Sequence, residues 1–155
     1  MNLRDKLLNP GRHCPGSSLG LLLLRAIPAL LMIPHGWAKL AGFADYADKF
    51  PDPIGLGGTF SLVLAIFAEL ICSLLLILGL GTRVVAIPLL ITMLVAAFIV
   101  HGSDPFAKKE LALLYAATFL PLLFTGAGEF SVDAKLTRAR GFDASFSVSA
   151  EKSPD

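Results

Sequence analysis

Six ionisable side chains lie within or beside long apolar stretches of the chain: Arg25, His35, Lys39, Glu69, His101 and Glu110. An ionised group in hydrocarbon costs at least about 2.5 kcal/mol, so such residues usually face a protein interior, find partners and mark function. His35 and Lys39 are four residues apart and therefore share one face of a helix. A histidine titrates near neutral pH, which suits proton transfer or hydrogen bonding to a ligand carbonyl. The pattern indicates proton or polar-ligand chemistry in an apolar environment.

The chain is rich in hydrophobic residues and poor in charged ones. The chain has 155 residues, of which 55% are hydrophobic and 16% are charged, whereas about a quarter of the residues of a soluble domain are charged. Apolar runs of about 20 residues match the thickness of a bilayer. The sequence predicts an all-α integral membrane four-helix bundle, with spans near residues 18–40, 59–80, 83–100 and 105–125.

The chain divides into a polar N-terminal segment 1–17, a four-helix transmembrane domain 18–136 and a flexible C-terminal tail 137–155. Arg25 interrupts the first apolar run, which favours a retained helix over a cleaved signal peptide. Basic residues are about twice as frequent beside the termini and the second turn as on the other side. By the positive-inside rule, both termini are expected to be cytoplasmic. The expected location is the bacterial cytoplasmic (inner) membrane, crossed several times.

Several residues predict local structure. Pro28 and Pro34 remove backbone donors from the first helix and favour a kink there. Gly79 and Gly81 are both suited to cap the second helix, and Thr82 is expected to be the N-cap of the third. Asp104 is expected to be the N-cap of the fourth helix, with Pro105 at its first helical position. The stretch 41–58 is rich in turn residues and aromatics, and it is expected to form an ordered interfacial loop.

Each chemical candidate also has an ordinary explanation. Arg25 and Glu69 are expected at similar depth and hence to pair, either for function or only to fix the register of two helices. Lys39 can extend its ammonium to the interface, and Glu110 can favour the positive end of a helix dipole. Glu110 could instead be the acidic partner of His35, Lys39 or His101. Trp37 is either an interfacial anchor or part of a site for a flat ligand.

Some functions are disfavoured by the sequence. No HxxxH, HExxH or paired-cysteine spacing accompanies His101, so no metal site is expected. Net charge is +1 and no basic block is present, so no nucleic-acid partner is expected. Cys14 and Cys72 fall at different expected depths and cannot easily pair.

The segments "LLLRAIPALLMIPHGWAKL", "FAELICSLLLILGLGTRVVAIPLLITMLVAAFIVHG" and "ELALLYAATFLPLLFTGAGEFSVDAKL" together resemble the DoxX family of small four-helix bacterial membrane proteins. The resemblance covers roughly residues 19–136. It implies a four-helix bundle with cytoplasmic termini. It also implies an association with membrane oxidoreductase complexes, because the family is named for its likeness to the quinone-reducing subunit of an archaeal oxidoreductase.

The leading hypothesis is a membrane redox subunit that binds a quinone, or a similar amphipathic molecule, beside a partner oxidoreductase in the lipid bilayer. His35, Lys39, Glu69 and Glu110 are the predicted catalytic, proton-handling residues. Arg25, Trp37 and His101 are the predicted cofactor-binding residues, with Arg25 holding Glu69 ionised. The alternative is a non-enzymatic solute transporter or a scaffold for a partner protein, with a break in the first helix at Pro28 and Pro34. Homo-oligomerisation is left open by the sequence, as is whether the chain is an enzyme by itself.

Overall fold

The computed structural model describes residues 15–53 and 55–136, and within these residues it is helical with no β-strand. Segments 1–14 and 137–155 lie outside the described residues. The structure therefore describes only residues 15–17 of the predicted polar segment, and the predicted tail lies wholly outside the described residues. A short helical turn covers residues 132–136. The other elements are α2 (Pro15–Ala41), α3 (Phe43–Tyr46), α4 (Gly58–Ile66), η1 (Phe67–Cys72), α5 (Ser73–Leu78), α6 (Thr82–Val95), η2 (Ala96–Val100) and α7 (Phe106–Thr125).

The predicted helix boundaries agree closely with the structure. The elements α4, η1 and α5 form one helical run from 58 to 78, and α6 with η2 forms another from 82 to 100. The largest difference is at the start of α2, which begins at Pro15 rather than at residue 18. Apolar run length was therefore a sound guide to the helices.

Three helices of the described part are long and apolar enough to cross a membrane. They are Gly16–Ala41, Gly58–Leu78 and Thr82–Val100, with mean hydropathies of 1.8, 2.7 and 2.5. The helix α7 has 20 residues but carries Lys108, Lys109 and Glu110 near its start, and it is not among the three. Large apolar side chains point outward, as at Val84, which is 70% exposed, and at Phe98, which is 65% exposed. A surface of this kind is suited to lipid rather than to water.

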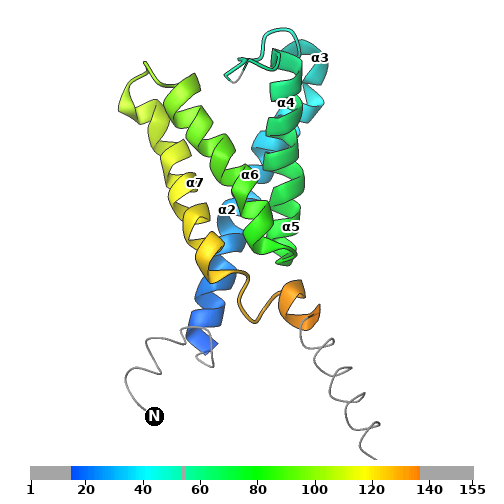
Figure 1. The fold of residues 1–155 in the computed structure, drawn as a ribbon, viewed down its shortest axis with the longest axis vertical. Helices are drawn as coiled ribbons and strands as arrows, with labels where there is room; N and C mark the ends of the chain where they lie inside the picture. Colours follow the sequence, from blue (N-terminus) through cyan, green and yellow to red (C-terminus); the bar gives the residue numbers. More distant parts are fainter. Residues whose placement is uncertain (1–14, 54, 137–155) are drawn as a thin grey trace, which may run out of the picture.

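The molecule has two ends (Figure 1). One end, here called the α3 end, carries α3, the loop 47–57 and the turn 101–105. The opposite end, here called the Arg25 end, carries the start of α2, the turn 79–81 and residues 126–136. The helix α7 packs along α6, while α2 contacts η1, α5 and α7. Residues far apart in the sequence are therefore brought together at each end.

An apolar core lies between the two ends. Its buried side chains come from α2, η1, α5, α6 and α7, and they include Ala29, Met32, Leu76, Leu89 and Phe119, all at most 1% exposed. The core cluster contains no charged side chain. Small and large side chains alternate in it, which allows the helices to pack closely.

The expected irregularity in the first helix is found elsewhere. The helix α2 continues unbroken from Pro15 to Ala41, through both Pro28 and Pro34. The helical runs widen instead into π-helical turns at η1 and η2. Such turns are frequent at functional sites because the extra residue shifts the side chains that follow it.

At Gly36 the backbones of α2 and η1 approach each other closely. A Cβ atom at this position would lie 2.9 Å from the backbone nitrogen of Leu70 and 3.0 Å from the carbonyl carbon of Glu69. Only a glycine lets the two backbones approach this closely. The contact fixes η1 against α2 one helical turn before Lys39.

The turn between α5 and α6 is closed by a residue from beyond α7. Gly79 caps α5 with φ of +68°, as predicted. Thr82 was wrongly predicted as an N-cap, because it is the first residue of α6. The carboxylate of Asp133 instead accepts hydrogen bonds from the backbone nitrogens of Gly81, at 2.8 Å, and Thr82, at 3.2 Å. A carboxylate is favoured there by the unpaired N–H groups and the helix dipole.

The loop after α3 is held by one carboxylate. Asp52 accepts hydrogen bonds from the backbone nitrogens of Leu56 and Gly57, at 3.0 and 2.9 Å, and from Ser61 Oγ at 3.3 Å. The N–H group of Gly57 is the largest cause of a pKa of Asp52 below its ordinary value. This loop is therefore ordered by its own polar groups, as its composition predicted.

Candidate functional site

The central feature of the site is an ion pair between α2 and η1. Lys39 Nζ donates to Glu69 Oε2 over 2.5 Å. The side chain of Glu69 is 6% exposed and that of Lys39 is 25% exposed. A charge-assisted hydrogen bond of this length is among the stronger polar contacts in proteins. The Gly36 contact places both residues, since it brings the backbone of η1 onto α2.

The predicted pair of Arg25 and Glu69 is wrong. Arg25 is 1% exposed and lies at the opposite end, where its Nη2 donates to the carbonyl oxygen of Phe130. Its guanidinium fills the space that a side chain at Gly79 would occupy, and it interacts electrostatically with Asp133. Long helical side chains point toward the helix N-terminus. Arg25 therefore extends away from Glu69, and Lys39, which is about 21 Å further along the helix, takes that place.

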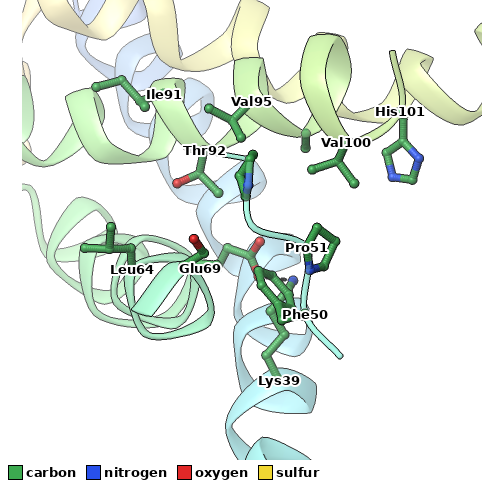
Figure 2. A pocket seen from close by; sticks show the side chains of 14 residues that line it. Lys39, Phe50, Pro51, Leu64, Glu69, Ile91, Thr92, Val95, Val100 and His101 are labelled. Carbon is green, nitrogen blue, oxygen red and sulfur yellow. Dashed lines mark hydrogen bonds and ion pairs between the residues drawn. The ribbon is translucent and has the colours of Figure 1, made fainter. Parts of the chain in front are cut away.

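A cavity of about 320 Å³ lies beside the ion pair. It lies between α4 with η1 on one side and α6 with η2 on the other, and Figure 2 shows these walls facing each other. Lys39 and Glu69 provide its charged wall. Most of the remaining lining is apolar, and the side chains from the two helices include Leu64, Ala65, Ile91, Thr92 and Val95. We call this space the interhelical cavity.

A second space, of about 460 Å³, adjoins the first at the α3 end. His35, Tyr46 and Lys49 line it. Lys39, Phe50 and Pro51 line both spaces, so these three residues form the partition between them. We call this second space the end hollow.

The structure separates the remaining predicted site residues. His35 is exposed, and its ring lies edge-on to Tyr115 of α7 with centroids 6.4 Å apart. His101 lines the far part of the interhelical cavity, where its Nδ1 lies 2.8 Å from Asp104 Oδ2. This hydrogen bond is the largest cause of a pKa of Asp104 below its ordinary value. Asp104 thus binds a side chain of the same turn and does not cap α7, whose N-cap is Pro105.

Two predicted residues lie outside both spaces. Glu110 is exposed near the start of α7, and within the described residues its carboxylate makes no hydrogen bond or ion pair. The predicted pairing of Glu110 with His35, Lys39 or His101 is therefore wrong in this structure. Trp37 is 61% exposed and points outward from α2. Among residues 15–53 and 55–136, no group of three His, Cys, Asp or Glu side chains could hold a metal ion.

Sequence reasoning missed the packing role of Gly36 and the capping role of Asp133. The glycine follows His35 directly, and a glycine inside an apolar helix is a known sign of close helix packing. Phe50 was interpreted, like Trp37, either as an interfacial aromatic or as part of a site for a flat ligand, and it lines both spaces. Asp133 was noted only as part of a family pattern, because a cap that acts across 52 residues has no local sequence signal.

Long apolar helices, outward-facing apolar side chains and polar groups gathered at two ends define a multi-pass membrane protein. The chain belongs to the DoxX family, whose model matches residues 20–102. It is a multi-pass protein of the bacterial inner membrane.

Three relatives show the range of the similarity. The chain is 38% identical to an uncharacterized protein of Haemophilus influenzae over 122 residues, which cover 74% of this chain and 89% of that protein. It is 30% identical to inner membrane protein YqjF of Escherichia coli, over 77% of this chain and 94% of that protein. It is 32% identical to a Bacillus subtilis protein named "Putative oxidoreductase CatD", over 74% of this chain and 85% of that protein. No solved structure gives a significant match.

Proposed function

We propose that the interhelical cavity binds a quinone, or a similar amphipathic small molecule, and that the protein works as a membrane redox subunit beside a partner oxidoreductase. The observation that carries this proposal is the Lys39–Glu69 ion pair in the wall of an otherwise mostly apolar cavity. An apolar space with a few convergent polar groups is the usual form of a small-molecule site, and about 320 Å³ is within the ordinary size range.

The ion pair offers both kinds of hydrogen bond that a quinone needs. Within the described residues, the side chains of Lys39 and Glu69 form hydrogen bonds only with each other. An ammonium has three donors and a carboxylate has two oxygens, so donors and an acceptor are left for a ligand. A quinone carbonyl accepts from Lys39, and a hydroquinone hydroxyl donates to Glu69. The pair therefore serves both redox forms of the same ligand.

The ligand enters from lipid in this proposal. Leu64, on one wall of the cavity, is 40% exposed, and Ile91, on the other, is 55% exposed. These side chains belong to helices that are apolar on their outer faces. A ligand tail can follow them into the bilayer while the polar ring stays beside the ion pair.

The roles of the predicted residues change accordingly. Lys39 and Glu69 contact the ligand, and His101 lies at the far part of the same cavity. His35 belongs to the adjoining hollow, so it acts on Lys39 from the side away from the ligand. Arg25 stabilises the opposite end, and Trp37 is an interfacial residue.

The membrane arrangement belongs to the proposal. The helix α7 is a fourth span, and both termini are cytoplasmic, so that the α3 end faces the periplasm. This orientation rests on the basic residues near the termini and the turn with Arg83. The name of the Bacillus subtilis relative supports an oxidoreductase partnership. The transporter alternative relied on a broken first helix, whereas α2 is continuous.

Quinone binding can be tested with the chain's only tryptophan, Trp37, because quinones quench indole fluorescence. The protein in lipid is titrated with a short-tailed ubiquinone. We expect saturable quenching, weakened at least about tenfold in Lys39→Gln and Glu69→Gln, since each loses a charge-assisted hydrogen bond. Lys135→Gln is the matched control, because Lys135 is exposed at the Arg25 end and lines neither the cavity nor the end hollow. Quenching that rises without saturation in the native protein would refute the proposal.

A further inference from the structure

The two polar ends of the protein are separated by the apolar core. On the Arg25 side of Glu69, the buried side chains toward the centre include Met32, Leu76 and Leu89, all at most 1% exposed. The charged groups resume only with Arg25, which binds Phe130 and interacts with Asp133. Ser73, one turn beyond Glu69, is a buried polar side chain in this layer, and the apolar side chains of Leu76 and Leu89 follow it. A single hydroxyl does not give water and protons a continuous polar path to Arg25.

Toward the α3 end, polar side chains continue from the ion pair to the solvent. The interhelical cavity reaches Ser61, whose hydroxyl donates to Asp52 in the loop, and His101, which binds Asp104 in the turn. The side chain of His101 is 39% exposed and that of Asp104 is 33% exposed. The titratable groups beyond the ion pair on this side therefore have contact with solvent.

Lys39 lies where the cavity meets the end hollow. Its side chain lines both spaces, together with Phe50 and Pro51. On the hollow side it is accompanied by His35 and Lys49. The ammonium can thus contact a ligand in the cavity through one N–H group and water in the hollow through another.

We propose that the Lys39–Glu69 pair exchanges protons and water with the aqueous phase at the α3 end only, through the end hollow. This inference rests on the proposed function for its ligand but not for its geometry. When the partner oxidoreductase supplies two electrons to a bound quinone, two O–H bonds form. Both protons come from the α3 side. Lys39 gives one proton to the ligand oxygen beside it and regains one from the water of the hollow, and a water molecule that enters the cavity from the same side gives the second proton to the other ligand oxygen.

The titratable groups around the ion pair come from several of the elements packed against it. They are His35 on α2, Tyr46 and Lys49 from α3 and its loop, Asp52 through Ser61, His101 with Asp104 beyond η2, and Tyr115 on α7 behind His35. Tyr115 belongs to the edge of the apolar core, where its ring stacks on Phe119, and the other groups lie from the level of the ion pair toward the α3 end. None offers a route to the Arg25 end.

The test uses single cysteines in a Cys14→Ser, Cys72→Ala background. Ala38→Cys reports on the end hollow, Ala65→Cys on the cavity and Ala29→Cys on the apolar core. A charged, membrane-impermeant thiosulfonate is added to either face of the native membrane, using spheroplasts and inverted vesicles. Arg83→Cys, at an exposed position of the Arg25 end, marks the opposite face. If Ala65→Cys fails to fold, Thr92→Cys reports on the same cavity from α6.

We expect positions 38 and 65 to react from one face, position 83 to react from the other, and position 29 to react from neither. Reaction of position 65 from the face that labels position 83 would overturn the inference, and so would no reaction of position 65 from either face. The short-tailed ubiquinone should slow labelling at position 65. Labelling that is one-sided but unaffected by ubiquinone would contradict the proposed function and leave the one-sided access intact.

A second measurement follows protons directly. In oriented proteoliposomes, the pH is changed on one side while quenching of Trp37 by the ubiquinone is recorded. We expect a severalfold change in ubiquinone affinity only when the pH changes on the α3 side. A response to the other side, or to neither side, would overturn the inference.

Discussion

Replacing Gly36 by alanine tests the close contact between α2 and η1. The new Cβ would lie 2.9 Å from Leu70 N, 3.0 Å from Glu69 C and 3.1 Å from Glu69 Cβ, whereas ordinary contacts begin near 3.4 Å. The helices must therefore separate by about half an ångström. Overpacking of this kind costs about 1–3 kcal/mol. Alanine also favours a helix over glycine by about 1 kcal/mol, so we expect a net loss of about 0–2 kcal/mol.

Gly20 provides the matched control, because it is exposed on the same helix and nothing lies within 4 Å of a Cβ built there. Gly20→Ala should gain the helix propensity without the clash. The difference between the two variants cancels the propensity and isolates the packing cost, which should be about 1–3 kcal/mol.

The assay is unfolding in detergent mixtures, followed by far-ultraviolet circular dichroism. The variants are compared at equal protein and detergent concentrations. If Gly36→Ala and Gly20→Ala have equal stabilities within about 0.5 kcal/mol, the contact between α2 and η1 is not as close as described. The placement of Lys39 against Glu69 would then need another explanation.

Three further predictions concern charged groups. Lys39→Ala leaves a buried carboxylate unpaired and should cost more stability than the double variant with Glu69→Ala, with a coupling of about 1–3 kcal/mol in the same unfolding assay; additive losses would contradict the ion pair. Asp133→Ala removes both hydrogen bonds at the start of α6 and should lower the free energy of unfolding by about 1–2 kcal/mol. Asp133→Asn should lower it less. No change in amide hydrogen exchange at the start of α6 would argue against this cap. Because the pKa of Asp52 is lowered by the folded loop, its stabilising effect should be complete above its ordinary pKa of about 4 and lost as the pH falls through the lower folded value. The amide chemical shift of Gly57 should follow that loss, and should not do so in Asp52→Asn.

The sequence predicted the helices because apolar run length and glycine caps are local signals. The first helix was located within three residues at its start, and the turn at Gly79 was identified correctly. Asp104 and Thr82 were misassigned as caps for a physical reason. Any residue of their type satisfies the local pattern, whereas the N–H groups at the start of α6 are bonded by a carboxylate from a distant segment.

The site was predicted in its residue types but not in its pairing. Depth along a helix was taken from residue number alone, which put Arg25 near Glu69. The direction of a long side chain moved Arg25 toward one end, and the Gly36 contact brought Lys39 to Glu69. The cavity itself could not be predicted, because its lining includes residues of two π-helical turns, η1 and η2, that the sequence does not mark.

The bonds that Phe130 and Asp133 make have a consequence for biosynthesis. Arg25 emerges from the ribosome 105 residues before its partner Phe130, and the start of α6 emerges about 50 residues before Asp133. At about 5–20 residues per second, the arginine waits roughly 5–20 seconds for its acceptor. During this interval the nascent chain holds an uncompensated cation and an open helix start beside the translocon. Binding of the segment with Phe130 and Asp133 is therefore the last step in assembly of the described domain. A chain truncated before Phe130 would lack both contacts and would be a substrate for the cell's proteases.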